Sequence, residues 1–201
     1  MGERCNRTAE VRGSIPLSST TLFAEAAASG TPPPPRVKNA EPALPRPLER
    51  LLGELGETLR PCRDPWWVIG SAAMALHGAE GLEVHDIDLL LSRRDARERL
   101  EERGLSALPG TEDERFHSDI FGTWYEGAYR VEMFGAFKVR DGAGWVEISP
   151  ASRVEVRAGT SSLYVPSVEE LIRLGRLFGR AKDAAREPLL LALLAKGGTS
   201  G

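Results

Sequence analysis

The 201-residue sequence contains only two cysteines, which limits the disulfide bonds and the cysteine-bound metal sites that it can form. Cys5 lies near the N-terminus and Cys62 follows a proline, and the two do not form the spaced pairs of a zinc or iron–sulfur motif. Two isolated cysteines also do not make the framework of a disulfide-rich secreted domain. We therefore expect a protein of the reducing cytoplasm.

Long apolar runs and an excess of positive charge are also missing. The longest apolar stretch, residues 188–195, is far too short to span a bilayer, and no apolar segment of signal-peptide type occurs near the start. We expect no membrane association. The formal charge is −3, so any nucleic-acid partner would need a local basic patch rather than a general positive field.

Residues 1–46 lack the periodicity of a folded segment. Prolines crowd this region at positions 32–35, 42 and 45, among Ser, Thr and Gly. Such a composition predicts a disordered or polyproline-type tail, and a proline-rich docking segment is the functional alternative. We expect one domain at residues 47–196, followed by a short flexible tail at 197–201.

The N-terminal tail raises a question about where translation starts. Residues 13–16, Gly-Ser-Ile-Pro, can be encoded by GGT-TCG-ATT-CCC, which resembles the conserved arm near the 3′ end of a transfer RNA gene. No methionine occurs between Met1 and Met74. One hypothesis is therefore that the reading frame has been opened too far upstream, with a true start at an alternative codon such as Val37 or Leu44.

The rest of the chain is organised around residues 66–92. Residues 66–69 are apolar and β-prone and stop at Gly70 and Ser71, which predicts a buried strand and a turn. The alanine-rich stretch that follows predicts a short helix capped by Ser71. Backbone N–H groups at such a helix start favour an anion.

A second strand is predicted at residues 84–91, and it carries two acidic side chains. Because side chains alternate along a strand, Asp86 and Asp88 share one face at a Cα spacing of about 6.6 Å, while Ile87 points to the core. Two carboxylates at the edge of an apolar strand are costly to bury unless they bind a cation. A divalent metal is the obvious candidate.

The remaining pattern predicts helices and strands in an α+β arrangement. Leucines repeat on one helical face at residues 47–60, and capping boxes at Ser92 and Ser167 open two further helices. A last helix is expected to run through Leu194 with an interruption at Pro188. Strands are predicted at residues 115–125, 128–134, 136–140, 145–148, 153–156 and 162–165.

A Gly-Ser turn followed by an Asp-x-Asp strand resembles the nucleotidyltransferase superfamily, which includes DNA polymerase β, antibiotic nucleotidyltransferases and minimal toxin-type enzymes. Gly70 and Ser71 match the turn, and Asp86 and Asp88 match the acidic strand. Glu132, between Val131 and Met133, matches the third carboxylate, for which many relatives have Asp. The resemblance implies a mixed β-sheet flanked by helices, with a C-terminal helical segment.

The resemblance also implies an activity, a cofactor and partners. Two Mg²⁺ ions would be held by Asp86, Asp88 and Glu132, while Gly70, Ser71 and Lys182 would bind the nucleoside triphosphate (NTP). The reaction would move a nucleoside monophosphate from the NTP to a hydroxyl on a small molecule, a protein or an RNA end. Toxin-type relatives imply an antitoxin-like partner protein.

Other interpretations of these residues stay open. The alternatives are a solvated strand end for Asp86 and Asp88, a plain helix cap for Ser71, an exposed strand position for Glu132 and a surface ion pair for Lys182. The Glu at position 132 and Arg186, where relatives often carry an acid, favour the main functional alternative, a degenerate relative that binds a nucleotide or a partner without catalysis. A two-metal nuclease is a weaker third hypothesis.

Overall fold

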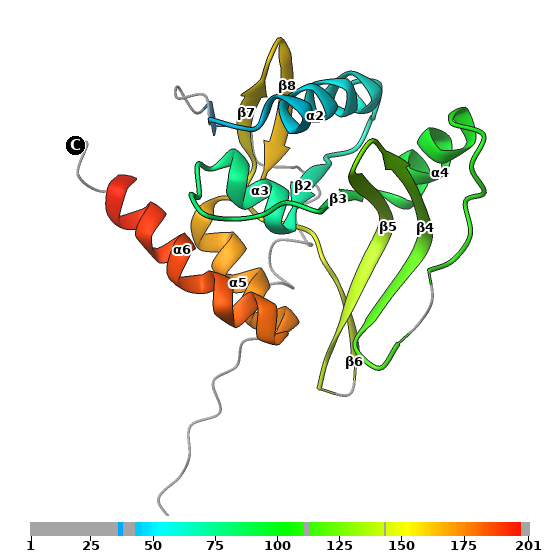
Figure 1. Cartoon of the computed structure of the whole chain (residues 1–201). Helices are drawn as coiled ribbons and strands as arrows, with labels where there is room; N and C mark the ends of the chain where they lie inside the picture. Colours follow the sequence, from blue (N-terminus) through cyan, green and yellow to red (C-terminus); the bar gives the residue numbers. More distant parts are fainter. Residues whose placement is uncertain (1–35, 38–42, 111–112, 143, 198–201) are drawn as a thin grey trace, which may run out of the picture. The chain divides into compact units, whose positions relative to one another are not determined.

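The computed structural model describes residues 36–37, 43–110, 113–142 and 144–197, all within one unit of the chain, Thr31–Gly201 (Figure 1). Most of the predicted tail at residues 1–46, and residues 198–201, lie outside the described residues. The described part is α+β, as the sequence predicts, with helices packed on a mixed sheet.

The main sheet has five strands in the order β2-β3-β5-β4, with β6 added on β5. Their bounds are Trp67–Ile69 for β2, Asp86–Leu91 for β3, Phe116–Glu126 for β4, Tyr129–Asp141 for β5 and Gly144–Glu147 for β6. Only β3 and β5 pair in parallel; β2, β4 and β6 are antiparallel to their neighbours. The two strands predicted at residues 128–134 and 136–140 are one continuous strand, β5, and β4 and β5 form the long hairpin visible in Figure 1.

Three further strands form a second sheet, in the order β1-β7-β8, which shares no strand pairing with the main sheet. It is built from β1 (Arg36–Val37), β7 (Val154–Ala158) and β8 (Ser161–Val165). The expectation of no regular structure before residue 47 is therefore wrong at β1. A strand of two residues is too short to show an alternating sequence pattern, and β1 is a strand because it pairs in parallel with β7.

Helix α2 (Arg46–Leu59) packs on the β7–β8 hairpin through its glycines. A Cβ added at Gly56 would lie 3.0 Å from the Cβ of Ser161 and 3.1 Å from the carbonyl oxygen of Ser162. Such distances are tighter than ordinary contacts, so the glycine permits the close approach of helix and hairpin. The loss of helix propensity at this position is offset by packing, with the leucine face of α2 fully buried.

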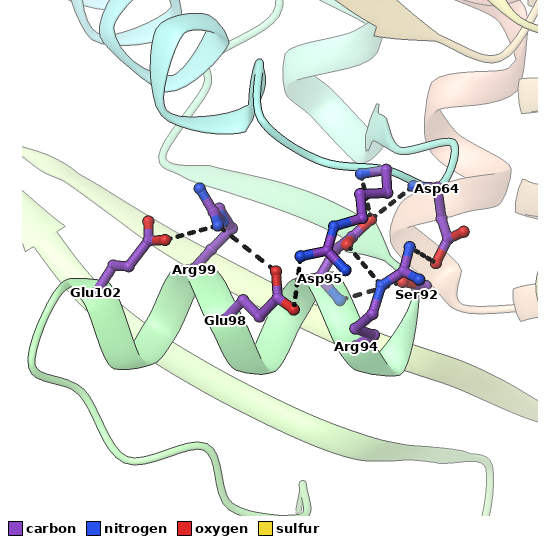
Figure 2. A network of polar contacts seen from close by, with 8 residues as sticks. Asp64, Ser92, Arg94, Asp95, Glu98, Arg99 and Glu102 are labelled. Atoms are coloured by element: carbon purple, nitrogen blue, oxygen red, sulfur yellow. Dashed lines mark hydrogen bonds and ion pairs between the residues drawn. The ribbon is translucent and has the colours of Figure 1, made fainter.

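Helix α4 (Arg93–Glu102) covers one face of the main sheet, and its start is fixed by a polar network (Figure 2). Oγ of Ser92 accepts the amide of Asp95 at 3.2 Å, which confirms the predicted cap. The carboxylate of Asp95 does not complete a capping box with residue 92. It is 1% exposed and accepts the amides of Arg63 and Asp64, so it ties the loop before β2 to α4.

Helices α5 (Val168–Phe178) and α6 (Ala181–Gly197) follow the second sheet and pack side by side (Figure 1). Gly179, in the left-handed conformation at φ 59°, ends α5 and turns the chain into α6. The predicted interruption at Pro188 is wrong, because α6 continues through that residue to Gly197. Within the described residues, no helix combines the length and the apolar character needed to cross a bilayer.

Candidate functional site

The acidic residues predicted from the sequence lie on one face of the main sheet. Asp88 of β3 and Glu132 of β5 are register partners in the parallel pair, and Asp86 is the partner of Arg130. Because paired residues of adjacent strands share a face, Glu132 lies on the same side as Asp86 and Asp88. The opposite face carries Ile87, Leu89 and Val131, which are fully buried.

The Gly-Ser turn lies directly beside Asp88. Ile69, the last residue of β2, is the register partner of Asp88, and Gly70 follows with φ +66°. A Cβ on Gly70 would overlap the Oδ2 atom of Asp88. Glycine is thus required here for two reasons. Its φ is positive, and the carboxylate of Asp88 fills the space that a side chain would need.

Ser71 does not cap the short helix α3 (Gly70–Leu76), contrary to the prediction. The helix begins at Gly70, the cap position is Ile69, and no side chain there accepts a hydrogen bond. Ser71 lies in the first turn and is 5% exposed. The helix begins two residues earlier than a cap at Ser71 would imply, because the chain already turns out of β2 at Gly70, whose positive φ a glycine adopts readily.

Burial and neighbouring acids strongly perturb Asp88. The pKa of Asp88 is raised from 3.8 to about 7, mainly by burial and in addition by the negative charges of Glu132 and Asp86. Lys182 and Arg180 act in the opposite direction. Asp88 therefore lies at the point where three acids from two strands meet two cations from the start of α6.

The segment before and within the first turn of α6 borders the Gly70 turn. Arg180 and Asp183 line a small cavity together with Gly70, and Arg186 lines it one turn further along α6. Arg180 and Asp183 form a two-bonded ion pair, at 2.7 Å for Nε and 3.0 Å for Nη2. Lys182 is exposed and lies close enough to Asp88 to influence its pKa.

Arg130 binds two of the three acids. Its Nε donates to Oδ1 of Asp86 at 3.1 Å, and its Nη2 lies 3.4 Å from Oε1 of Glu132. Both contacts raise the pKa of the guanidinium. The side chain is 41% exposed, so it can leave this position without breaking the core.

An aromatic surface continues the acidic face along β4 and β5. Phe134 is two residues beyond Glu132 on β5, and its ring centroid lies 5.2 Å from that of Phe121, its partner on β4. Thr123 is the partner of Glu132, and Tyr125 is the partner of Arg130. Acids and aromatic rings therefore occupy neighbouring rows of one sheet face.

A comparison with solved structures agrees with this architecture. No family model and no curated protein match the chain. The solved structure of a Thermotoga maritima protein, described provisionally as a nucleotidyltransferase, is similar over 71% of this chain and 91% of its own, with a TM-score of 0.58 and 24% identity. An antigenic nucleotidyltransferase-like protein from Paracoccidioides brasiliensis covers 77% of this chain and 78% of its own, with a TM-score of 0.44 and 14% identity.

The chain has a nucleotidyltransferase-like fold. The structure brings together residues that the sequence prediction named. Asp86, Asp88 and Glu132 share one face of the sheet, Gly70 lies against Asp88, and the charge of Lys182 acts on Asp88. Their catalytic and binding roles stay predictions.

The oxygen atoms of Asp86, Asp88 and Glu132 can be compared with the ligands that a divalent cation needs. Carboxylate oxygens are the ligands that Mg²⁺ prefers, and burial together with the charges of Glu132 and Asp86 raises the pKa of Asp88, so a cation bound there would be favoured by all three acids. Within the described residues, however, no three His, Cys, Asp or Glu side chains are placed so that together they could hold a metal ion. The donors fit the cation chemically, and Arg130 is the group that would have to move.

Arg130 and Tyr125 were missed at the sequence level, although the signal was present. Arg130 is two residues before Glu132, so the alternation that assigns Glu132 to the site face assigns Arg130 to it as well. Tyr125 requires one more step, the register of the β4–β5 hairpin, which follows from the turn at Gly127.

Proposed function

We propose that the protein is a divalent-metal-dependent nucleotidyltransferase, which transfers a nucleoside monophosphate from an NTP to a hydroxyl acceptor. The observation that carries the proposal is the register of β3 and β5, because it sets Asp86, Asp88 and Glu132 on one face beside Gly70. The nucleotidyltransferase-like fold supports it, since the matched structure places the chain among proteins of this architecture.

In the proposed reaction, the acceptor oxygen forms a bond to the α-phosphorus while the bond from that phosphorus to the bridging oxygen breaks, and pyrophosphate leaves. Mg²⁺ held by Asp86, Asp88 and Glu132 would lower the pKa of the hydroxyl and neutralise charge on the leaving group. The missing side chain of Gly70 leaves room for the carboxylate of Asp88, so that this carboxylate and the turn can face the triphosphate together. Lys182 and Arg180 would supply positive charge to the phosphates, and Glu132 would accept the proton of the hydroxyl.

The test is transfer of label from the α-phosphate. Purified protein with Mg²⁺ and each α-labelled NTP is incubated with candidate acceptors, and NTP binding is followed by calorimetry. Asp88→Asn should abolish transfer while the fold, checked by circular dichroism, persists. Glu147→Gln, which removes an exposed acid on β6 of the same sheet, serves as the matched control and should keep full transfer.

The contacts of Arg130 favour a second candidate, a nucleotide-binding relative without catalysis. An arginine bound to Asp86 and Glu132 supplies the charge that a cation would otherwise supply. In that case the protein takes up NTP in calorimetry, yet no pyrophosphate appears with any acceptor at any Mg²⁺ concentration. Transfer that survives Asp88→Asn would overturn the metal-site assignment itself.

A further inference from the structure

One large aromatic side chain on the site face is exposed to solvent. Tyr125 is 72% exposed, near the end of β4, and its partner on β5 is Arg130, which in turn binds Asp86. Thr123, one row along β4, is also exposed and is the partner of Glu132. An exposed ring next to a row of carboxylates marks the open side of the site, where a second substrate can enter.

The chemistry of the reaction separates two sides of this face. In an in-line displacement, the attacking hydroxyl approaches the α-phosphorus opposite the departing pyrophosphate. Gly70 borders Asp88 at the end of β2, and the Arg180 guanidinium lies 5.4 Å from the ring centroid of Phe116 at the start of β4, so the pyrophosphate belongs to the side of this face away from Tyr125. The hydroxyl acceptor must then come from the end of β4 that carries Thr123 and Tyr125, which lie about 4.8 Å across the sheet from Glu132 and Arg130.

We propose that the exposed Tyr125 ring is a stacking surface for the acceptor, and that the acceptor is a small molecule with a hydroxyl group and a planar aromatic or heterocyclic ring. This inference rests on the proposed function and names its substrate class. Two more aromatic rings, Phe121 and Phe134, lie on the same face, on the opposite side of the Thr123–Glu132 pair from Tyr125. Aromatic faces select planar rings over aliphatic groups of similar size.

The test compares acceptors with and without a ring. Wild-type protein, Mg²⁺ and the four α-labelled NTPs are given N-acetyltyrosinamide or pyridoxine, and, in parallel, N-acetylserinamide or glycerol. The ring compounds should be labelled preferentially. Tyr125→Ala should raise their KM about two- to tenfold with little change in kcat, and Tyr125→Phe, which keeps the ring, should restore the wild-type KM.

Two controls separate this inference from the proposed function. Leu191→Ala trims an exposed apolar side chain on α6, 48% exposed, and should leave the KM for every acceptor unchanged. The Kd for Mg-NTP, measured by calorimetry without an acceptor, should be the same in wild type and Tyr125→Ala. A wild type that binds no NTP and releases no pyrophosphate overturns the proposed function, and this inference falls with it.

Three results overturn the inference while leaving the proposed function standing. One is labelling of the ring-free compounds in preference to the ring compounds, or labelling of neither pair by a protein that does bind Mg-NTP. Another is an equal KM in wild type and Tyr125→Ala. The third is a weaker Kd for NTP in Tyr125→Ala, which would assign the ring to the nucleobase instead of the acceptor.

Discussion

The carboxylate of Asp88 occupies the space that a side chain at Gly70 would need. The two residues come from different elements, the turn after β2 and the middle of β3, and they meet because Ile69 is the register partner of Asp88. Any substitution at Gly70 therefore acts on the acidic cluster directly. The turn and the acidic strand behave as one structural unit.

Gly70→Ala should disable the site more than it destabilises the fold. The alanine must adopt φ +66°, which costs about 1–2 kcal/mol, and its Cβ must also displace Asp88. We expect loss of NTP binding in calorimetry and loss of transfer. Thermal unfolding should show a Tm lowered by a few degrees, with a folded spectrum retained.

Gly81→Ala is the matched control for this substitution. Gly81 has nearly the same backbone conformation, φ +70°, and a Cβ there meets nothing within 4 Å. Its alanine variant bears the same conformational cost without a contact to the acids. NTP affinity should match the wild type in Gly81→Ala; an equal loss of affinity in both variants would show that backbone strain, and not Asp88, is responsible.

Asp88→Asn should increase stability in metal-free buffer at alkaline pH. The folded-state pKa of Asp88 is raised from 3.8 to about 7, so its favourable contribution is fully present below pH 3.8 and is lost as pH rises through 7. Asparagine never acquires this charge. At pH 8 we expect an increase of roughly 4 kcal/mol, because each pKa unit corresponds to about 1.4 kcal/mol, and this amounts to roughly 8–16 °C in Tm for a domain of this size.

The pH dependence is the check on this prediction. Below pH 3.8 the wild-type carboxyl is protonated in both the folded and the unfolded protein, so the difference between the two Tm values should be smallest there. It should open between about pH 4 and pH 7 and level off at higher pH. A gap of constant size would attribute the effect to packing instead of ionisation. Added Mg²⁺ should stabilise the wild type alone if Asp88 is a metal ligand.

Arg130→Gln should strengthen metal binding and weaken the metal-free fold. Two partly exposed ion pairs, with Asp86 and Glu132, compete with a cation for the same oxygens, and their loss is worth about 1–2 kcal/mol. We expect an affinity for Mn²⁺ or Mg²⁺ about tenfold higher in calorimetry. Arg50→Gln, which removes an exposed ion pair on α2, is the control and should change nothing. Weaker metal binding in Arg130→Gln would show that Arg130 supports the site.

The β2–α3–β3 unit could be predicted from sequence because its signals are local. A short apolar run, a glycine turn and strict alternation around Asp86 and Asp88 need no distant partner, and the structure places β2 and β3 within two residues of the prediction. The shared face of Asp88 and Glu132 then follows once β3 and β5 pair.

Other features depended on distant partners and could not be predicted in this way. The acids at the third position of α4 and α5 look like halves of capping boxes, yet Asp95 binds the amides of residues 63 and 64, and Glu170 binds those of Ala151 and Ser152. Likewise, the strands at residues 154–158 and 161–165 are visible in the sequence, but their assignment to a separate sheet is set by packing on α2. Strand propensity therefore predicts that such strands exist but does not predict which strands or helices they pack against.

Lys182→Gln should shift the pH profile of transfer toward higher pH as well as weaken NTP binding. Lys182 lowers the pKa of Asp88, so its removal raises that pKa above about 7, and a larger fraction of Asp88 stays protonated at neutral pH. If transfer needs the carboxylate, the rate at pH 7 falls and recovers at pH 8–9. NTP affinity should fall about tenfold at all pH values, because a charge-assisted phosphate contact is lost. Lys196→Gln, at the other end of α6, carries the same change of charge away from the site and should leave the profile in place. A profile that stays fixed in Lys182→Gln would mean that Asp88 is not the group whose ionisation controls the rate.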